Sequence, residues 1–191
     1  MRVGVDLDGV VVDFFGEIVK FYNMKYRRNL KVEGLRGYNI WEYGIGRNRE
    51  EAFSLMDEFY DSEFFSSIPL LIGAENVLKG FSKNEGFDVI TSRPEKLRGK
   101  TEKFLMRHFD KNFRLVFSGE FNAGLKKKSE LCRELGLDVF VEDCLDYAID
   151  CARTCERVFL MNQPWNQGRL PGNVARVNDW YEISEILGAR K

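Results

Sequence analysis

Short apolar runs alternate with longer segments of helical periodicity from residue 75 onwards. The apolar runs lie at 87–90, 113–117, 139–141, 158–161 and 174–177, and the helical segments lie at 75–84, 95–108, 126–135, 145–153 and 180–187. Strands that alternate with helices of this length form parallel βαβ units, because each crossover helix returns the chain to the same edge of the sheet. The pattern therefore predicts an α/β fold built on a parallel sheet.

The first 72 residues depart from this alternation. The apolar run at 1–5 ends in acidic residues, which is the pattern of a buried strand that leads into a site. Residues 14–72 are rich in aromatic side chains and mostly helical in period, with several glycines in the middle and Pro69 near the end. We expect residues 14–72 to form a helical cap inserted over a catalytic core made of residues 1–13 and 73–191.

Charge and hydropathy exclude several classes of protein. The net charge of −1 provides no general basic field, whereas tight binding to a nucleic acid polymer usually leaves a basic footprint. No apolar run approaches the roughly 18 residues that a membrane span needs, and Asp6, Asp8 and Asp13 interrupt the apolar start of a signal peptide. We therefore expect a cytoplasmic protein that acts on a small anionic molecule and has no membrane partner. The sequence sets no oligomeric state.

The cysteines are expected to be reduced. Without a secretion signal, Cys132, Cys144, Cys151 and Cys155 are predicted to be buried thiols, and a disulfide is the alternative. The single histidine, His108, argues against a histidine nucleophile or a histidine-rich zinc site. Acid–base chemistry must then fall to carboxylates.

Polar residues gather at the carboxyl ends of the predicted strands, where ligands bind in sheets of this kind. The run 1–5 is followed by Asp6, Asp8 and Gly9, the run 87–90 by Thr91, Ser92, Arg93 and Pro94, and the run 139–141 by Glu142 and Asp143, with Asp146 close behind. Two carboxylates about 4 Å apart repel by about 4 kcal/mol at an effective dielectric constant of about 20. A hard divalent cation relieves this repulsion, and oxygen ligands favour Mg²⁺ over zinc.

Four segments, in chain order, resemble the motifs of the haloacid dehalogenase superfamily. Asp6-Leu7-Asp8-Gly9-Val10 resembles motif I, Thr91-Ser92-Arg93-Pro94 resembles motif II, Lys128 at the start of a helix resembles motif III, and Glu142-Asp143 resembles motif IV. The resemblance implies a Rossmann-like, doubly wound parallel sheet of order 5-4-1-2-3, with a small helical cap of the C1 type after strand 1. It also implies a magnesium-dependent phosphatase, because the dehalogenases lack the second aspartate of motif I.

The resemblance further implies the catalytic roles. Asp6 is the nucleophile that forms an aspartyl-phosphate, and Asp8 protonates the leaving oxygen and then activates water. Thr91 or Ser92 and Lys128 bind the phosphoryl oxygens, with Lys127 as the alternative to Lys128. The hydroxyls of motif II could also cap a helix.

The metal site follows from the same resemblance. Asp6, Asp8 through its backbone carbonyl, and Asp143 hold Mg²⁺. Glu142 is expected to support these ligands from behind, and Asp146 is the alternative second acidic group.

The cap and the loop at 162–166 resemble the 5'(3')-deoxyribonucleotidase-like branch of the superfamily. This favours a small phosphorylated metabolite, with nucleoside monophosphates first, as the substrate. Arg93 either contacts a substrate phosphate or forms a surface salt bridge. Trp41, between Gly37 and Gly46, is expected at the tip of the cap facing the substrate, or else in the core of the cap. The alternatives to a hydrolase are a phosphate-binding regulatory protein and a phosphomutase on the same fold.

Overall fold

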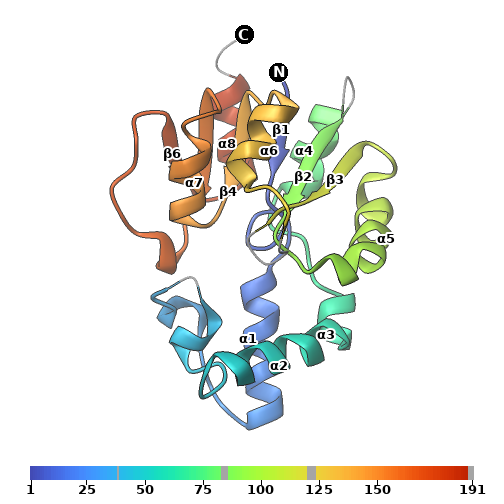
Figure 1. Ribbon diagram of the computed structural model, residues 1–191, viewed down its shortest axis with the longest axis vertical. Coiled ribbons are helices and arrows are strands. Elements are labelled where there is room, and N and C mark those ends of the chain that lie inside the picture. Colours follow the sequence, from blue (N-terminus) through green and yellow to red (C-terminus); the bar gives the residue numbers. More distant parts are fainter. Residues whose placement is uncertain (38, 83–85, 120–123, 189–191) are drawn as a thin grey trace.

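A six-stranded parallel sheet forms the centre of the molecule (Figure 1). The computed structural model describes residues 1–37, 39–82, 86–119 and 124–188. The strands are β1 (Val3–Val5), β2 (Phe87–Thr91), β3 (Phe113–Phe117), β4 (Val139–Glu142), β5 (Arg157–Met161) and β6 (Val174–Val177), in the order β3-β2-β1-β4-β5-β6. The predicted α/β class is confirmed. The predicted order 5-4-1-2-3 covered five strands, and β6 extends the sheet beyond β5, where Val158 pairs with Val174.

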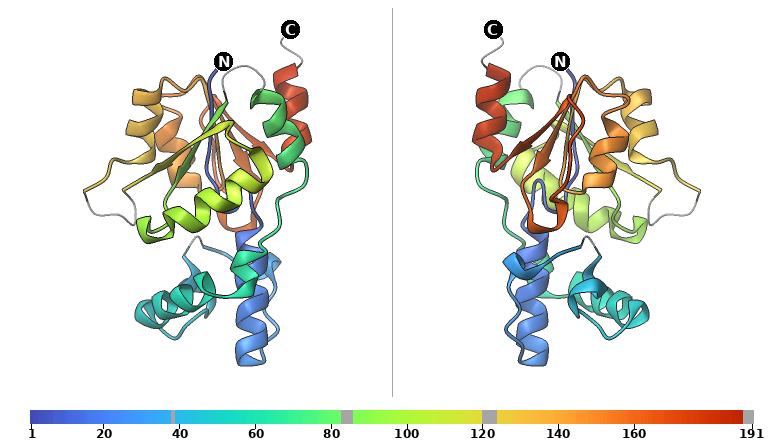
Figure 2. Two further views of the ribbon diagram at one scale, coloured as in Figure 1. Left: turned by 90° about the vertical axis from the view of Figure 1, so that its right-hand side faces the viewer. Right: turned by 90° about the vertical axis from the view of Figure 1, so that its left-hand side faces the viewer.

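Alternating side chains of the strands build two hydrophobic cores, one on each face of the sheet. Successive residues of a strand point to opposite faces, so Val139 and Val141 enter one core and Phe140 enters the other. Because both faces are covered, the central strands are apolar at almost every position. Figure 2 shows α4 (Ala74–Ser82) and α8 (Trp180–Gly188) on one side of the sheet, and α6 (Lys128–Leu135) and α7 (Leu145–Cys151) on the other.

The helices of the core lie close to their predicted ranges. The segment 95–108 becomes a short 3-10 turn, Glu95–Leu97, followed by α5 (Arg98–Phe109). The segment 126–135 begins two residues later than expected, at Lys128. The predicted helix 75–84 corresponds to α4, and its last two positions belong to residues 83–85, which lie outside the described part of the chain.

Residues 14–66 form a separate group of helices below the carboxyl edge of the sheet (Figure 1). They comprise α1 (Phe14–Tyr26), α2 (Arg49–Tyr60) and α3 (Glu63–Ser66), with 3-10 turns at Val32–Gly34 and Ile40–Tyr43. Phe59 is fully buried among them, with its ring centroid 5.5 Å from that of Phe14 and 5.6 Å from that of Phe65. Aromatic residues of this helical group, called the cap segment below, therefore pack against one another in its core.

Two antiparallel segments connect this helical group to the sheet. The Asp13 N–H donates to the Pro69 carbonyl at 2.9 Å, and the Leu71 N–H donates to the Val11 carbonyl at 2.9 Å. These hydrogen bonds hold the two connecting segments side by side, close to the predicted boundaries of the cap at residues 14 and 72. The division into a core of 1–13 and 73–191 and a cap of 14–72 stays a prediction.

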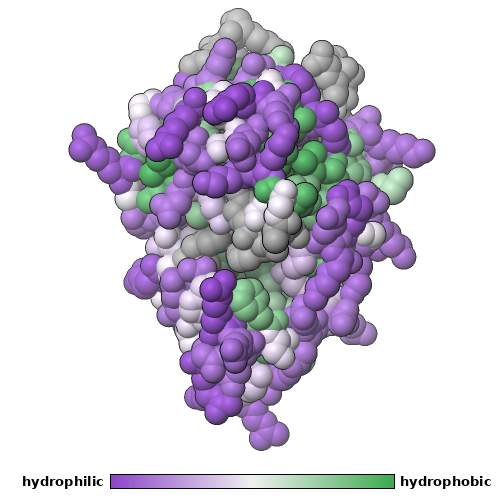
Figure 3. Space-filling view, in the orientation of Figure 1, coloured by the Kyte–Doolittle hydropathy of each residue, from purple (hydrophilic) through white to green (hydrophobic). Residues whose placement is uncertain are grey.

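All four cysteines are free and buried. The Cys132 and Cys151 sulfur atoms lie 3.9 Å apart, so the two thiols are in contact without a bond. Among the described residues, no helix is both long enough and apolar enough to cross a membrane. The face seen in Figure 1 is mostly hydrophilic, with hydrophobic residues in small separate groups (Figure 3).

Candidate active site

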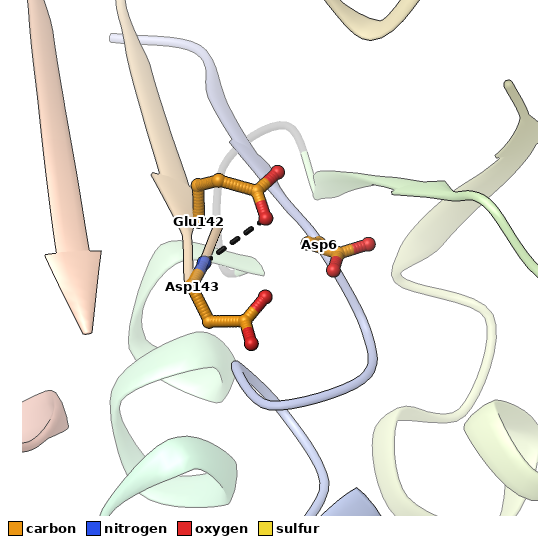
Figure 4. Close-up of side chains that lie close together, drawn as sticks. All are labelled: Asp6, Glu142 and Asp143. Atoms are coloured by element: carbon orange, nitrogen blue, oxygen red, sulfur yellow. Dashed lines mark hydrogen bonds between the residues drawn. The ribbon is translucent and has the colours of Figure 1, made fainter. Parts of the chain in front are cut away.

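Asp6, Glu142 and Asp143 place three carboxylates at the carboxyl ends of the two central strands. Asp6 follows β1, and Glu142 and Asp143 lie at the end of β4 (Figure 4). Each offers an oxygen within 4.8 Å of the others, and the exposed fraction of all three residues is at most 3%. β1 and β4 are neighbours that run parallel, so their register sets this convergence. Asp146, in contrast, is exposed in the first turn of α7 and lies outside the cluster.

A buried lysine joins two of these carboxylates. The Lys128 ammonium lies 3.0 Å from Asp6 Oδ1 and 2.8 Å from Glu142 Oε2, and the residue is 1% exposed. Burial lowers the pKa of Lys128, but the two carboxylates outweigh this effect and hold it well above its usual value. Lys126 and Lys127 are exposed, so Lys128 is the lysine of the triplet that reaches the site.

Glu142 is occupied by protein contacts on both carboxylate oxygens. Its Oε2 accepts from Lys128, and its Oε1 accepts from the backbone N–H groups of Asp143 and Cys144 at 3.0 and 3.1 Å. These contacts fix the end of β4 and the lysine. The role of Glu142 as a group that supports the site from behind stays a prediction, with which these contacts agree.

Asp143 has the features of a cation ligand. Its Oδ2 accepts from the Trp165 indole N–H at 3.2 Å, and among the described residues its buried Oδ1 has no hydrogen-bond partner. An unpaired buried carboxylate oxygen is costly unless a positive group meets it. Three carboxylates against one ammonium leave two excess negative charges, the amount that a divalent cation neutralises.

The pKa shifts support the same interpretation. Burial raises the pKa of Asp6 to about 7, although Lys128 opposes the shift. Burial, together with the charges of Glu142 and Asp6, raises the pKa of Asp143 well above its usual value. A divalent cation between the two side chains would favour their ionised forms, since an opposite charge lowers the pKa of a carboxyl group. The donor set therefore fits a hard cation that prefers oxygen.

Gly9 lets the loop after β1 pass closely over Asp143. Its φ is +79°, and a Cβ atom there would lie 2.5 Å from Asp143 Oδ2. A larger residue would meet both backbone strain and a clash with a buried carboxylate. Gly9 of motif I is therefore needed because a larger side chain there would collide with Asp143 of motif IV.

Hydroxyl groups line the neighbouring strand ends. Thr91 ends β2 and Ser92 follows it, and they are 1% and 8% exposed. The Ser92 hydroxyl lies 3.1 Å from the Ser118 hydroxyl, and the Thr91 hydroxyl accepts from the Arg93 N–H at 3.2 Å. Neither of these two residues caps a helix, because the turn Glu95–Leu97 begins after Pro94.

The buried Arg93 forms an ion pair with the half-buried Asp8. Its Nε donates to Asp8 Oδ2 at 2.8 Å, its Nη2 donates to Asp8 Oδ1 at 2.6 Å, and its Nη1 donates to the Thr101 hydroxyl at 3.2 Å. Of the two alternatives for Arg93, the salt bridge is present, but its expected surface position was wrong, because the residue is only 4% exposed. β2 ends beside β1, which brings motif II against the second aspartate of motif I. The Asp8 side chain is therefore held by Arg93, and its carboxylate is not part of the three-carboxylate cluster.

A cavity of about 110 Å³ lies between the helical cap segment and these groups. Its polar wall includes Asp6, Asp8, Ser92 and Arg93, and its other walls include Phe14, Phe15, Asn39, Trp41, Phe53 and Tyr60. Trp41 thus shares a cavity with both aspartates of motif I. Its ring also contacts Phe53, with centroids 5.9 Å apart, so the residue belongs to the wall as well as to cap packing.

Three residues of this site were missed in the sequence. Asn166 is 1% exposed and donates to the backbone carbonyls of Asp143 and Met161 at 2.7 and 2.6 Å. The Trp165 indole N–H donates to Asp143, and its ring packs against the Phe15 ring of α1 with the ring centroids 4.1 Å apart. Ser118 follows β3 and meets Ser92. All three lie just beyond carboxyl ends of strands, so the strand-end rule applied to every strand would find them.

Solved structures support a haloacid dehalogenase-type fold. A haloacid dehalogenase-like hydrolase of Streptococcus pneumoniae superposes with a TM-score of 0.68 over 100% of this chain and 98% of that chain, at 13% identity. The Bacillus subtilis hydrolase YfnB, solved bound to magnesium, superposes with a TM-score of 0.61 over 98% of both chains, at 15% identity. At these identities the likeness shows the fold alone, which is that of this class of hydrolase.

Comparison of sequences identifies the family within that class. The chain belongs to the family described as 5' nucleotidase, deoxy (pyrimidine), cytosolic type C protein, whose model matches residues 1–191. A candidate nucleotidase of Halalkalibacterium halodurans is 27% identical over 182 residues, which are 95% of this chain and 89% of that protein. A nucleotidase of Clostridium acetobutylicum is 22% identical over 187 residues, covering 98% of this chain and 93% of that protein.

The close approach of Gly9 to Asp143 predicts that adding a methyl group at position 9 lowers activity. Gly9→Ala should reduce turnover of acetyl phosphate by at least about a hundredfold, because Asp143 must move. Gly136→Ala is the matched control: φ is +61° there, but the nearest atom to an added Cβ is 3.7 Å away. Both variants should lose about 1–2 kcal/mol of stability from backbone strain, measured by urea denaturation. Equal activity of the two variants would contradict the assignment of Gly9.

Proposed function

We propose that this phosphatase is a magnesium-dependent phosphomonoesterase that acts through an aspartyl-phosphate on Asp6. The observation that carries the proposal is the meeting of Asp6, Asp143 and Lys128 in one buried cluster at the carboxyl end of the sheet. The nucleotidase family and the haloacid dehalogenase-type neighbours support it. The proposed division of labour places chemistry in residues 1–13 and 73–191 and substrate selection in a cap of residues 14–72.

In the first half-reaction, an Asp6 carboxylate oxygen attacks phosphorus, and the bond from phosphorus to the ester oxygen breaks. Asp8 gives its proton to the departing oxygen. In the second half-reaction Asp8 takes a proton from water, whose oxygen attacks the same phosphorus and releases phosphate and free Asp6. Splitting one displacement into two is the advantage of a carboxylate nucleophile, and one group can serve as acid and then as base.

The pair between Asp8 and Arg93 sets a condition for this cycle. Both carboxylate oxygens of Asp8 accept from the Arg93 guanidinium. Asp8 must therefore turn away from at least one of these contacts to reach a leaving oxygen. Arg93 thus orients Asp8 between turnovers, and it lines the cavity beside the reacting groups.

Phosphate oxygens would be held by Lys128 and by the hydroxyls of motif II. Ser92 lines the cavity, and Thr91 is buried behind it. Lys128 is fixed by Glu142, so its charge is already oriented before the substrate binds. Pre-oriented charge of this kind stabilises the transition state without reorganisation.

Asp6, Asp143 and the backbone carbonyl of Asp8 are the proposed magnesium ligands. The unpartnered Asp143 Oδ1 is the main support. When bound, Mg²⁺ supplies positive charge that lets an anionic carboxylate approach an anionic phosphate. Asn166 and Trp165 hold Asp143 in place for this role.

Nucleoside monophosphates are the proposed substrates. The walls of the cavity contributed by the cap segment are mostly aromatic or apolar, and Asn39 offers an amide that could read polar edges. Arg93 is paired with Asp8, so the described walls offer no unpaired cation for a second phosphate group. This combination favours a monophosphate carried on a ring. A regulatory phosphate-binding protein or a phosphomutase is less well supported, since both motif I aspartates and the Asp143 site are intact.

Replacing the nucleophile tests the mechanism directly. Asp6→Asn should lower kcat by more than about a thousandfold, because loss of a nucleophile costs several orders of magnitude. Asp146→Asn removes an exposed carboxylate of α7 that lies outside the cluster, and this variant should retain full activity. Turnover of p-nitrophenyl phosphate measures both variants. If Asp6→Asn kept more than about a thousandth of the wild-type activity, Asp6 would not be the nucleophile.

Metal removal tests the cation site. Chelation with EDTA should stop turnover, and added Mg²⁺ should restore it, because the excess negative charge at Asp6 and Asp143 would otherwise repel the phosphate. Asp143→Asn should require more Mg²⁺ for half-maximal activity than wild type, whereas Asp146→Asn should not. Full activity of the chelated wild-type protein would contradict the metal role.

Replacing Trp41 tests whether the cap selects substrates that carry a nucleoside base. Trp41→Ala should raise KM for nucleoside monophosphates by an amount equivalent to about 1–3 kcal/mol, the usual contribution of stacking on a base. Acetyl phosphate, which carries no ring, should be hydrolysed nearly as before. Tyr26→Ala removes an aromatic residue of α1 that is 48% exposed and lies outside this cavity, and it serves as the control. Equal losses on both substrates, with a lowered Tm, would make Trp41 a packing residue only.

A further inference from the structure

A second cavity, of about 190 Å³, lies where α3 of the cap segment meets α5 of the core. Four basic residues line it, Arg93, Lys100, Lys103 and Arg107, together with the rings of Phe65 and Phe104. None of the described lining residues is acidic. In a chain with a net charge of −1, such a concentration of one sign of charge is a local feature of this cavity.

Two of the four cations are already neutralised by carboxylates. Arg93 is paired with Asp8, and the Lys100 ammonium lies 2.7 Å from Asp61. Lys103 and Arg107 are exposed and stand one helical turn apart on α5, so their side chains share a face. Within the described part of the chain, neither has an acidic partner. The cavity therefore retains two positive charges, which match a phosphate dianion.

The apolar walls indicate what the anion is attached to. Phe65 and Phe104 are 5% and 8% exposed, and each turns part of its ring toward the cavity. An inorganic ion would leave these surfaces uncovered, whereas an organic group would bury them, and burial of apolar area is favourable. Lys and Arg side chains are the usual partners of phosphate oxygens.

We propose that this cavity is a second ligand site, which binds the phosphate group of a small organic phosphate without a metal ion. It differs in chemistry from the catalytic cavity, where carboxylates require a cation before an anion can enter. Arg93 lines both cavities, so the two sites meet at the residue that holds Asp8. The proposal does not depend on which ester the catalytic site hydrolyses.

Binding to metal-free protein separates the two sites. The protein is freed of metal by chelation and gel filtration, and phenylphosphonate, which cannot be hydrolysed, is titrated by calorimetry. One site should be observed. Lys103→Ala combined with Arg107→Ala should weaken it at least about tenfold, because two charge-assisted contacts are lost. Lys111→Ala combined with Arg133→Ala removes the same charge from exposed positions outside the cavity and should leave the affinity unchanged.

Comparing inorganic phosphate with phenylphosphonate shows whether the cavity prefers a free phosphate ion or a phosphate group on an organic molecule. Tighter binding of phenylphosphonate than of inorganic phosphate supports an organic ligand, and equal or weaker binding overturns that part of the proposal. No binding of either probe at about 10 mM, or equal binding to wild type and to the Lys103 and Arg107 double variant, overturns the site itself. Turnover of acetyl phosphate with Mg²⁺, within about twofold of wild type, verifies that the double variant is folded, since neither residue lines the catalytic cavity.

Discussion

The buried ammonium of Lys128 is the interaction on which the site depends. It contacts Asp6 from β1 and Glu142 from β4, and it begins α6, so three elements meet at one charge. An unpaired buried charge costs several kcal/mol, whereas a paired one with satisfied hydrogen bonds is tolerated. Removing any member of the group would leave the others uncompensated. The cluster is therefore a structural constraint on the carboxyl edge of the sheet, and in the proposed mechanism it also orients charge for phosphate.

The remaining carboxylate, Asp143, has one hydrogen-bonded oxygen and one buried oxygen without a partner among the described residues. Its backbone carbonyl is bound by Asn166, one oxygen is bound by Trp165, and Gly9 allows the neighbouring loop to lie against it. Its other oxygen is buried with no hydrogen-bond partner in the described part of the chain. A buried carboxylate oxygen without a partner is costly, and a bound cation would remove that cost. The same contacts tie the site to the cap segment, because Trp165 also stacks on Phe15.

Several side-chain contacts join the cap segment to motif II and α5. The Arg93 guanidinium lies 4.7 Å from the Phe65 ring of α3, while its hydrogen bonds go to Asp8 and Thr101 of the core. Lys96 and Lys100 reach Asp57 and Asp61 of the cap segment at 2.6 and 2.7 Å. These two exposed ion pairs contribute little stability each. The buried Arg93 thus contacts Asp8 and the Phe65 ring of α3, and it also lines the second cavity.

The sequence by itself determined the class of fold and indicated which polar residues gather at the carboxyl ends of the strands. Alternating apolar runs specify parallel strands, and strand ends specify where polar residues meet, because both follow from local periodicity. The partners of those residues were decided by tertiary structure. The sequence could not distinguish a surface position for Arg93 from a buried one paired with Asp8, since strand order brings positions 85 residues apart into contact. It likewise gave no role to Asn166, Trp165 or Ser118, and it could not reveal that Lys103 and Arg107 face a cavity closed by α3. Such contacts depend on the packing of distant elements, which no local pattern encodes.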